Sequence, residues 1–128
     1  LFTESTEFGS TKGLDLVKGV VKKFPISSSV EDRVKVPQIG WNQIFPENDE
    51  WSKSPLSVVQ PGEYVYFVHS FYVVPYEEVT LTTTTYGSTT YVSSILKENV
   101  FACQFHPEKS GSVGLDIYKN WAQINNLL

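Results

Sequence analysis

The sequence is poor in the residues that most often bind metals or form cross-links: it has no methionine, one cysteine and two histidines in 128 residues. A single cysteine excludes a disulfide within the chain and is typical of a reducing compartment, so we expect a cytoplasmic protein. The thiol and the two imidazoles, at positions 103, 69 and 106, do not reproduce the ligand spacing of a zinc site. We therefore expect no metal and no cofactor.

Long apolar runs and an excess of positive charge are also missing. No apolar stretch approaches the ~20 residues that cross a bilayer, and residues 1–4 lack the basic and apolar regions of a secretory signal. The formal net charge of -4 argues against nucleic-acid binding, which usually requires a basic patch. Glycine-rich phosphate-binding loops are absent as well. Length and composition instead predict one globular domain with its own core.

Hydrophobic patterns predict a strand-rich chain. Runs of β-branched and aromatic residues predict strands at residues 14–17, 19–24, 34–37, 64–68, 79–86, 89–96 and 100–105. Residues 40–42 are expected in a loop, and residues 48–53 and 55–58 in short helices. The apolar residues before Gly9 predict the end of a helix that this glycine closes.

Residues 113–128 are predicted to form an amphipathic helix. Apolar residues recur there at spacings of three and four, which places them on one helical face. We expect this face to pack onto the sheet, and it consists of Leu115, Tyr118, Trp121, Ile124 and Leu128.

The segment most informative about chemistry is Gln-Phe-His-Pro-Glu-Lys-Ser at residues 104–110, which follows an apolar strand. His106 and Glu108 are two residues apart, so in an extended backbone their side chains leave the same face. A carboxylate there fixes the imidazole tautomer and leaves the other ring nitrogen free to accept a proton from a nucleophile. A histidine near a glutamate is more often a surface pair without a catalytic role, and spacing alone leaves that interpretation open.

The neighbouring residues favour catalysis, because this string resembles the signature of class I (triad) glutamine amidotransferases. Further blocks resemble the glutaminase subunits of imidazole glycerol phosphate synthase, and they occur in the family's order over nearly the whole chain. These blocks are Lys-Val-Pro-Gln-Ile-Gly-Trp-Asn at 35–42, Tyr-Phe-Val-His-Ser-Phe at 66–71, Tyr-Gly at 86–87 and Gly-Leu at 114–115. Gln38 replaces the usual histidine, and Phe71 the usual tyrosine.

The resemblance implies a flavodoxin-like α/β fold, with a mostly parallel sheet, flanking helices and a small antiparallel portion at residues 81–96. It also implies that the chain is the C-terminal part of a single amidotransferase domain spanning residues 1–128. Residues 1–7 are similar to the segment that follows the family's nucleophile elbow. We therefore expect the nucleophilic cysteine, the oxyanion-hole loop and the first strands of the sheet to lie upstream, and the chain alone to be inactive.

The resemblance assigns roles to individual residues. His106 would be the general base and Glu108 its orienting carboxylate. Glu7 would contact the amino group of bound glutamine, although an exposed acid near a helix end is an equal alternative. His69, Ser70 and Phe71 would hold the substrate, although a lone histidine such as His69 more often has only a structural role.

Two residues predict a partner surface. By resemblance, Trp41 and Lys109 would face a synthase subunit with a (β/α)₈ barrel, near the mouth of an ammonia channel. A core tryptophan and a solvated lysine are the alternatives, although exposed tryptophans are enriched at interface hot spots.

Cys103 is not expected to be the nucleophile. It lies within a predicted strand, three residues before His106 and hence on the opposite face, and no glycine-flanked turn exposes its sulfur. A small buried thiol is the favoured interpretation.

Together these features predict a glutaminase that supplies ammonia to a cyclase partner for imidazole glycerol phosphate formation in histidine biosynthesis. The departures at Gln38 and Phe71 leave a second acceptor open, an amidino sugar of a surface polysaccharide. A non-catalytic amidotransferase-like scaffold and a threonine-rich carbohydrate-binding domain are rival hypotheses, and both leave the His-Pro-Glu string without a role.

Overall fold

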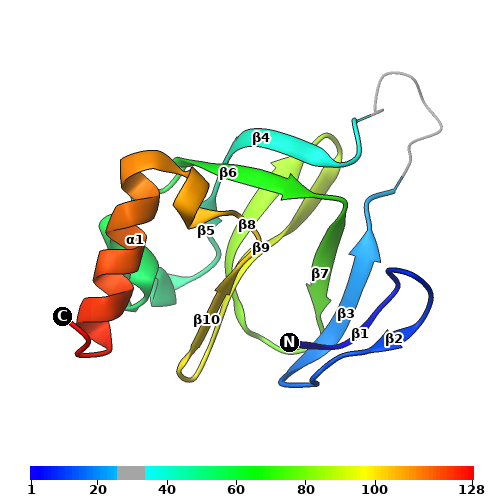
Figure 1. Cartoon of the computed structure of the whole chain (residues 1–128), viewed down its shortest axis with the longest axis horizontal. Helices are drawn as coiled ribbons and strands as arrows, with labels where there is room; N and C mark the ends of the chain where they lie inside the picture. The colour runs from blue at the N-terminus through cyan, green and yellow to red at the C-terminus, as the bar shows by residue number, and fades with distance from the viewer. Residues whose placement is uncertain (26–33) are drawn as a thin grey trace.

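The computed structural model describes residues 1–25 and 34–128, which form a strongly curved sheet with a helix against one side (Figure 1). The α/β class expected from the sequence is confirmed. In the described residues the main sheet runs in the order β2-β1-β3-β7-β9-β8-β5, with β10 also paired to β9. Its strands are β1 (Phe2–Ser5), β2 (Thr11–Lys12), β3 (Val17–Lys23), β5 (Phe45–Pro46), β7 (Phe71–Pro75), β8 (Thr80–Tyr86), β9 (Thr89–Lys97) and β10 (Val100–Cys103).

A separate antiparallel ribbon crosses one end of this sheet (Figure 1). It consists of β4 (Gln38–Gln43) and β6 (Tyr64–His69), paired from Gln38 opposite His69 to Gln43 opposite Tyr64. The loop expected at residues 40–42 is therefore part of β4, and the strand expected at residues 34–37 starts later. Proline has no N–H to donate, so the ladder begins after Pro37.

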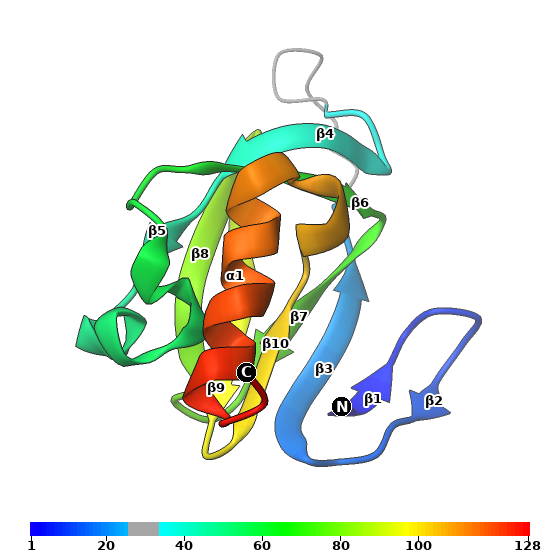
Figure 2. The same ribbon diagram turned by 60° about the vertical axis from the view of Figure 1, so that its left-hand side comes forward.

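The helices lie together on one side of the sheet, where α1 (Gly111–Ile124) packs against η2 and η3 (Figure 2). Short 3₁₀ helices form at η1 (Asp49–Lys53), η2 (Pro55–Val58) and η3 (Pro107–Lys109). The first two confirm the short helices expected at residues 48–53 and 55–58. Within residues 1–25 and 34–128, no helix combines the length and apolar character of a membrane span.

The expectation of a mostly parallel sheet is wrong for these residues. Among the pairings described, only β1 with β3 is parallel, and the remaining pairs are antiparallel. The connections give the reason. Two residues join β8 to β9, and two residues join β9 to β10. Parallel neighbours need a crossover of roughly a dozen residues, which these turns cannot provide.

The predicted helix end before Gly9 is also wrong, because residues 2–5 form β1. Phe2 is buried in a small cluster with Val17, Val79 and Ile95. Its backbone pairs with β3 at Val17. Burial of the ring and the β-ladder therefore override the local helical pattern. Similarly, the two strands expected at residues 14–17 and 19–24 are one strand, β3, which leaves Leu14 and Leu16 exposed.

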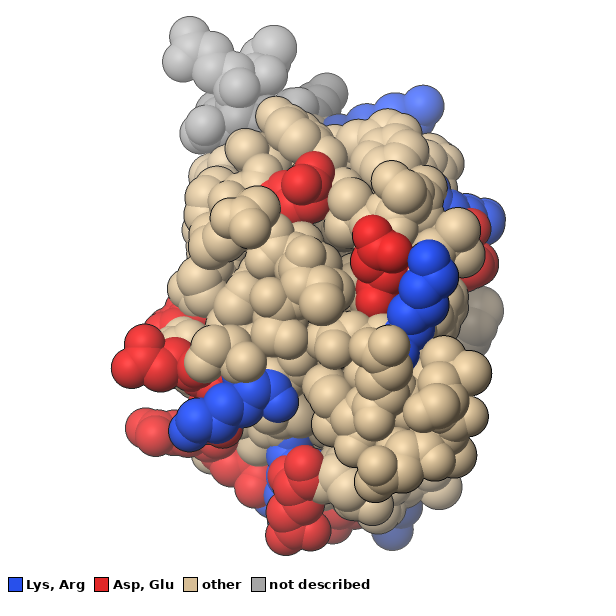
Figure 3. All heavy atoms as spheres, turned by 90° about the vertical axis from the view of Figure 1, so that its left-hand side faces the viewer, with Lys and Arg blue, Asp and Glu red and all other residues tan. Residues whose placement is uncertain are grey.

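The apolar stripe predicted to pack α1 onto the sheet faces outward. Gly114 and Ile117 are the buried residues of α1, whereas the expected set, Leu115, Tyr118, Trp121, Ile124 and Leu128, is exposed. Figure 3 views this side of the molecule and shows broad uncharged areas between a few charged side chains. Helical spacing correctly identified an apolar face, but the close contact of Gly114 with η3 decides which face turns inward.

The larger core lies between the β4–β6 ribbon, the main sheet and the helices. It is formed by buried side chains from all three parts, among them Phe24, Ile44, Leu56, Phe67, Tyr91, Phe105 and Ile117. The threonine run of β8 is a strand, as predicted, and its inward hydroxyls are bonded in part within the sheet. Thr82 Oγ1 lies 2.9 Å from Ser93 Oγ and 2.6 Å from Ser94 Oγ. These bonds offset the cost of burying the hydroxyls.

Candidate functional site

The His106 and Glu108 side chains point toward each other, as the sequence predicts, but the extended backbone expected between them is wrong, because residues 107–109 form the 3₁₀ helix η3. His106 Nδ1 lies 2.7 Å from Glu108 Oε1. Because a carboxylate only accepts, Nδ1 carries the proton and Nε2 is left as the basic nitrogen of a neutral ring. Both side chains are partly exposed, at 38% and 50%. The pair therefore lies at the surface of the described residues.

Backbone and side-chain bonds hold His106 in place. Its N–H donates to the Tyr66 carbonyl at 2.9 Å. The hydroxyl of Ser110 donates to the His106 carbonyl at 2.6 Å and accepts from the Tyr66 N–H at 3.0 Å. Ser110 is buried, so it connects the base to β6. The sequence analysis gave this serine no separate role, and its only sequence signal was its place at the end of the Gln-Phe-His-Pro-Glu-Lys-Ser string.

Gly114 fixes the turn that carries Glu108. A Cβ atom added to Gly114 would overlap the Pro107 carbonyl oxygen and lie 2.6 Å from the carbonyl carbon. Only glycine lets α1 approach the His-Pro-Glu segment this closely. The sequence presented Gly114 as part of a family block but did not indicate this contact.

Hydrogen bonds favour the ionised form of Glu108. The Glu108 backbone N–H, together with the side chain and charge of His106 and the charge of Lys109, holds the pKa of the Glu108 carboxyl below its usual range. The hydroxyl of Tyr118 also approaches the other carboxylate oxygen, at 3.5 Å. Near neutral pH Glu108 is therefore an anion that can orient the ring and stabilise its protonated form.

Cys103 is a partly buried thiol at the end of β10. Burial raises its pKa to about 12, and the Glu108 charge adds to the shift. Its sulfur lies 3.5 Å from the Phe105 carbonyl oxygen. A nucleophilic cysteine requires a lowered pKa, since the thiolate is the reactive form. The structure thus favours the structural role that the sequence indicates.

Four residues predicted to bind substrate line one open cavity of about 580 Å³. They are Glu7, His69, Ser70 and Phe71, and Gln104 and Pro37 contribute to the same wall. Glu7 is exposed at the rim. The pair His106–Glu108 does not line this cavity, although Gln104 is only two residues away from His106.

His69 is enclosed on the cavity's inner side. Its Nδ1 lies 2.8 Å from the Phe71 carbonyl oxygen and its Nε2 lies 3.2 Å from the Tyr91 hydroxyl. The Tyr91 oxygen in turn lies 3.0 Å from the Gln38 side-chain amide. Burial lowers the pKa of His69, and the charge of His106 adds to this effect, against the opposing bond to Phe71. Sequence reasoning did not connect these residues.

Trp41 of β4 and Lys109 of η3 both lie against Tyr66 on the outer face of the β4–β6 ribbon. The Trp41 ring packs edge-on against Tyr66, with centroids 5.9 Å apart, and Lys109 Nζ lies 5.9 Å from the Tyr66 centroid. Trp41 is 55% exposed. The same face carries the exposed side chains of Ile39, Tyr64 and Val68. We call this surface the ribbon face, and it consists of Ile39, Trp41, Tyr64, Tyr66, Val68 and Lys109.

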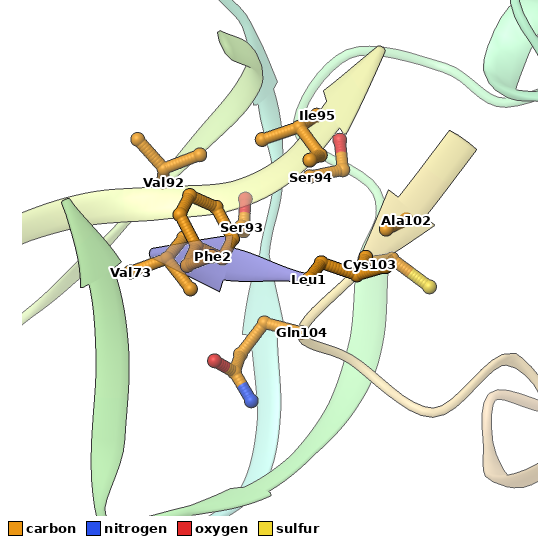
Figure 4. Close-up of a pocket in the computed structure, with 10 residues that line it drawn as sticks. All are labelled: Leu1, Phe2, Val73, Val92, Ser93, Ser94, Ile95, Ala102, Cys103 and Gln104. Atoms are coloured by element: carbon orange, nitrogen blue, oxygen red, sulfur yellow. The ribbon is translucent and has the colours of Figure 1, made fainter. Parts of the chain in front are cut away.

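A second cavity, of about 200 Å³, lies between β1 and the β9–β10 hairpin. Figure 4 shows its mainly apolar lining, with Cys103 Sγ directed away from the Phe2 ring. Apart from this thiol it has no titratable side chain. Among residues 1–25 and 34–128, no three histidine, cysteine or acidic side chains gather closely enough to hold a metal ion.

Comparison with known proteins agrees with this geometry. The family model of class-I glutamine amidotransferases matches residues 7–123. Imidazole glycerol phosphate synthase subunits HisH are among the most similar curated proteins. Those of Syntrophotalea carbinolica and Geobacter metallireducens are both 46% identical, over 127 and 125 residues. The HisH 1 subunit of Legionella pneumophila (strain Paris) is 41% identical over 128 residues.

These alignments cover 95–97% of this chain but 57–60% of each relative, so the chain spans less than two thirds of their length. The family model covers most of the chain, and the predicted resemblance is confirmed. The chain belongs to the class-I glutamine amidotransferase family.

Proposed function

We propose that the protein is a glutaminase subunit that hydrolyses glutamine to glutamate and ammonia, for use by a synthase partner that makes imidazole glycerol phosphate in histidine biosynthesis. The observation that carries the proposal is the bond of 2.7 Å between His106 Nδ1 and Glu108 Oε1 at an accessible surface. The relatives named above as HisH subunits support the choice of acceptor. A cytoplasmic location is part of the proposal, as the single cysteine suggests.

The proposed mechanism uses His106 as a proton carrier. Nε2 accepts the proton of a cysteine thiol, and the thiolate attacks the side-chain amide carbon of glutamine. His106 then protonates the departing nitrogen, which leaves as ammonia and a thioester remains. Water attacks the thioester with its proton passing to Nε2, which returns a proton to the sulfur as glutamate is released. Glu108 stabilises the imidazolium in both steps.

The thiol in this mechanism is not Cys103. The only cysteine of these 128 residues has a raised pKa, and its sulfur lies 3.5 Å from the Phe105 carbonyl oxygen. We therefore infer that residues 1–128 alone release no ammonia from glutamine, and that the nucleophile belongs to a part of the protein outside them.

A glutamine-hydrolysis assay tests the function and its acceptor. The protein expressed from its complete gene should release glutamate when mixed with a histidine-pathway cyclase from the same genome, and residues 1–128 should not. Ammonia release from residues 1–128 would contradict the assignment of the nucleophile. If glutamate release is stimulated only by a synthase encoded in a polysaccharide gene cluster, the result would instead support the amidino-sugar acceptor. An inactive complete protein would support the scaffold hypothesis.

The ribbon face is the proposed contact with the barrel-shaped partner. Trp41 is large, apolar and half exposed, and the neighbouring exposed side chains on the same face are mostly apolar. Monomeric proteins rarely expose such clusters without a binding role. Lys109 lies against the Tyr66 ring at the edge of this face and is available for an acidic group on the partner.

Replacing Trp41 with alanine should weaken partner binding. Loss of an aromatic hot spot costs about 2 kcal/mol, which corresponds to an increase in Kd of about 30-fold. Titration calorimetry of the full-length protein with its partner measures this change. Tyr76→Ala is the matched control, since Tyr76 is a 68% exposed aromatic residue outside the ribbon face. Equal binding by both variants would exclude Trp41 from the interface.

A further inference from the structure

A buried chain of hydrogen bonds lies behind the cavity that is lined by Glu7, Ser70 and Phe71. The proposed mechanism does not use this chain of bonds. These bonds connect Gln38 of β4, His69 of β6 and Tyr91 of β9, all of which are buried. His69 uses one ring nitrogen for Tyr91 and the other for the Phe71 carbonyl. The ring therefore has no nitrogen left for a molecule in the cavity.

The direction of these bonds follows from what each atom can donate or accept. The Phe71 carbonyl only accepts, so Nδ1 of His69 must carry a proton. In a neutral ring Nε2 accepts from the Tyr91 hydroxyl, and Gln38 must then turn its NH₂ group toward the Tyr91 oxygen. In a protonated ring Nε2 donates to Tyr91, whose own proton goes to the Gln38 oxygen. A glutamine amide can present either group, so Gln38 suits both states.

The surroundings of His69 favour the neutral ring. Phe24, Phe67 and Tyr91 pack around it with centroid distances of 5.2, 5.6 and 5.2 Å. An aromatic enclosure of this kind disfavours a buried positive charge. In the part of the chain that the structure describes, no carboxylate bonds to the ring to offset this. The titratable groups around this ring and its cavity are Tyr91 on β9, Tyr72 on β7, His106 after β10 and Glu7 at the rim.

The corner at residues 69–71 is held from two directions. On one side, the Phe24 N–H at the end of β3 donates to the Ser70 carbonyl at 3.0 Å. On the other side, His69 donates to the Phe71 carbonyl at 2.8 Å while Tyr91 holds the ring. Since a single residue connects β6 to β7, these bonds set the direction in which Ser70 and Phe71 face the cavity.

We infer that His69 is a positioning residue and not a substrate ligand: together with Tyr91 and Gln38 it fixes the Ser70–Phe71 corner of the cavity that binds glutamine. This inference rests on the proposed glutaminase function, and it assigns to Gln38 and Tyr91 a role in substrate binding that acts through the backbone of the corner.

Two substitutions of His69 in the full-length protein separate positioning from direct contact. An asparagine amide can occupy the place of Nδ1–H and donate to the Phe71 carbonyl, whereas leucine cannot. His69→Leu should raise the KM for glutamine about tenfold, the equivalent of one lost bond to a buried carbonyl, with kcat within about threefold. His69→Asn should keep KM within about threefold of the wild type. Tyr91→Phe should raise KM by a few fold, because the ring loses one of its two anchors.

A measurement without enzyme activity tests the same hydrogen bonds. Nitrogen-15 NMR of labelled histidine in the full-length protein, assigned by the signal lost in either His69→Asn or His69→Leu, reports the protonation of each ring nitrogen. We expect a neutral ring with the proton on Nδ1 near pH 7. This spectrum remains informative if one of the variants does not fold.

The outcomes distinguish the inference from the function on which it rests. Equal losses in His69→Asn and His69→Leu, or a ring that carries its proton on Nε2 or titrates like an exposed histidine, would overturn the positioning role. A wild-type protein that hydrolyses no glutamine with any partner would refute the glutaminase function, while the NMR spectrum would still decide whether the buried hydrogen-bond chain exists.

Discussion

His106→Asn in the full-length protein is expected to lower glutamine hydrolysis by about 10³-fold or more, since it removes the only general base of the proposed mechanism. Asparagine keeps an N–H close to the position of Nδ1 and can still donate to Glu108, so the local structure should survive. What it lacks is a basic nitrogen in the place of Nε2. Glutamate release under saturating glutamine measures the change in kcat.

Two further variants test the roles assigned around His106. Glu108→Gln should lower kcat by about 10²-fold or more, because an amide can donate to Nδ1 and stabilise the wrong tautomer. Tyr118→Phe is the control. It removes a hydroxyl that lies 3.5 Å from Glu108 and should change kcat by less than about threefold, since so long a contact is weak. The catalytic assignment fails if His106→Asn is folded and retains a tenth or more of the wild-type rate.

Gly114→Ala is the second substitution with a large expected effect. Alanine favours a helix interior over glycine by about 1 kcal/mol, so propensity alone predicts a more stable protein. The new Cβ would however overlap the Pro107 carbonyl oxygen, a contact with backbone that no side-chain rotation relieves. Overpacking of this kind typically costs about 1–3 kcal/mol or more, so we expect a net destabilisation and a displaced His-Pro-Glu segment.

Thermal unfolding and glutamine hydrolysis together measure this effect. We expect a clearly lower Tm and a rate reduced by about 10²-fold, because small displacements of a catalytic group are costly. Gly111→Ala is the matched control on the same helix. Gly111 has a positive φ of 63° but no atom within 4 Å of the place that a Cβ would occupy, so alanine there should cost about 1 kcal/mol and leave the rate nearly unchanged. A Gly114→Ala protein as stable and active as the wild type would show that α1 does not position the base.

The proposed catalytic pair of the site was easier to predict than the residues that hold this pair in place. His106 and Glu108 are two residues apart, so the sequence predicted that they meet, although Glu108 lies in the 3₁₀ turn η3 and not in an extended segment. The contacts of Ser110 and Gly114 depend on how α1 approaches β6 and η3, which no local pattern records. For the same reason the sequence did not show that Gln38 and Tyr91 meet His69, because they come from three different strands.

The elements that depend on local sequence were predictable. Those whose direction or buried face depends on tertiary contacts were less so. The threonine run of β8 and the short helices η1 and η2 follow from propensity and turn residues. The direction of strand pairing was expected from the family, although the two-residue turns at residues 87–88 and 98–99 already favour antiparallel neighbours. The inward face of α1 required knowledge of the Gly114 contact, since both faces contain apolar residues.

One hydroxyl group, that of Ser110, is bonded to both the carbonyl of His106 and the amide of Tyr66. The backbone of the base and the backbone of the ribbon face thus share an anchor. Residues that share a partner do not give additive free energies when both are changed. We therefore expect that the free-energy effects of substitutions at positions 66 and 106 do not add, and a double-mutant cycle across the two positions measures their coupling free energy.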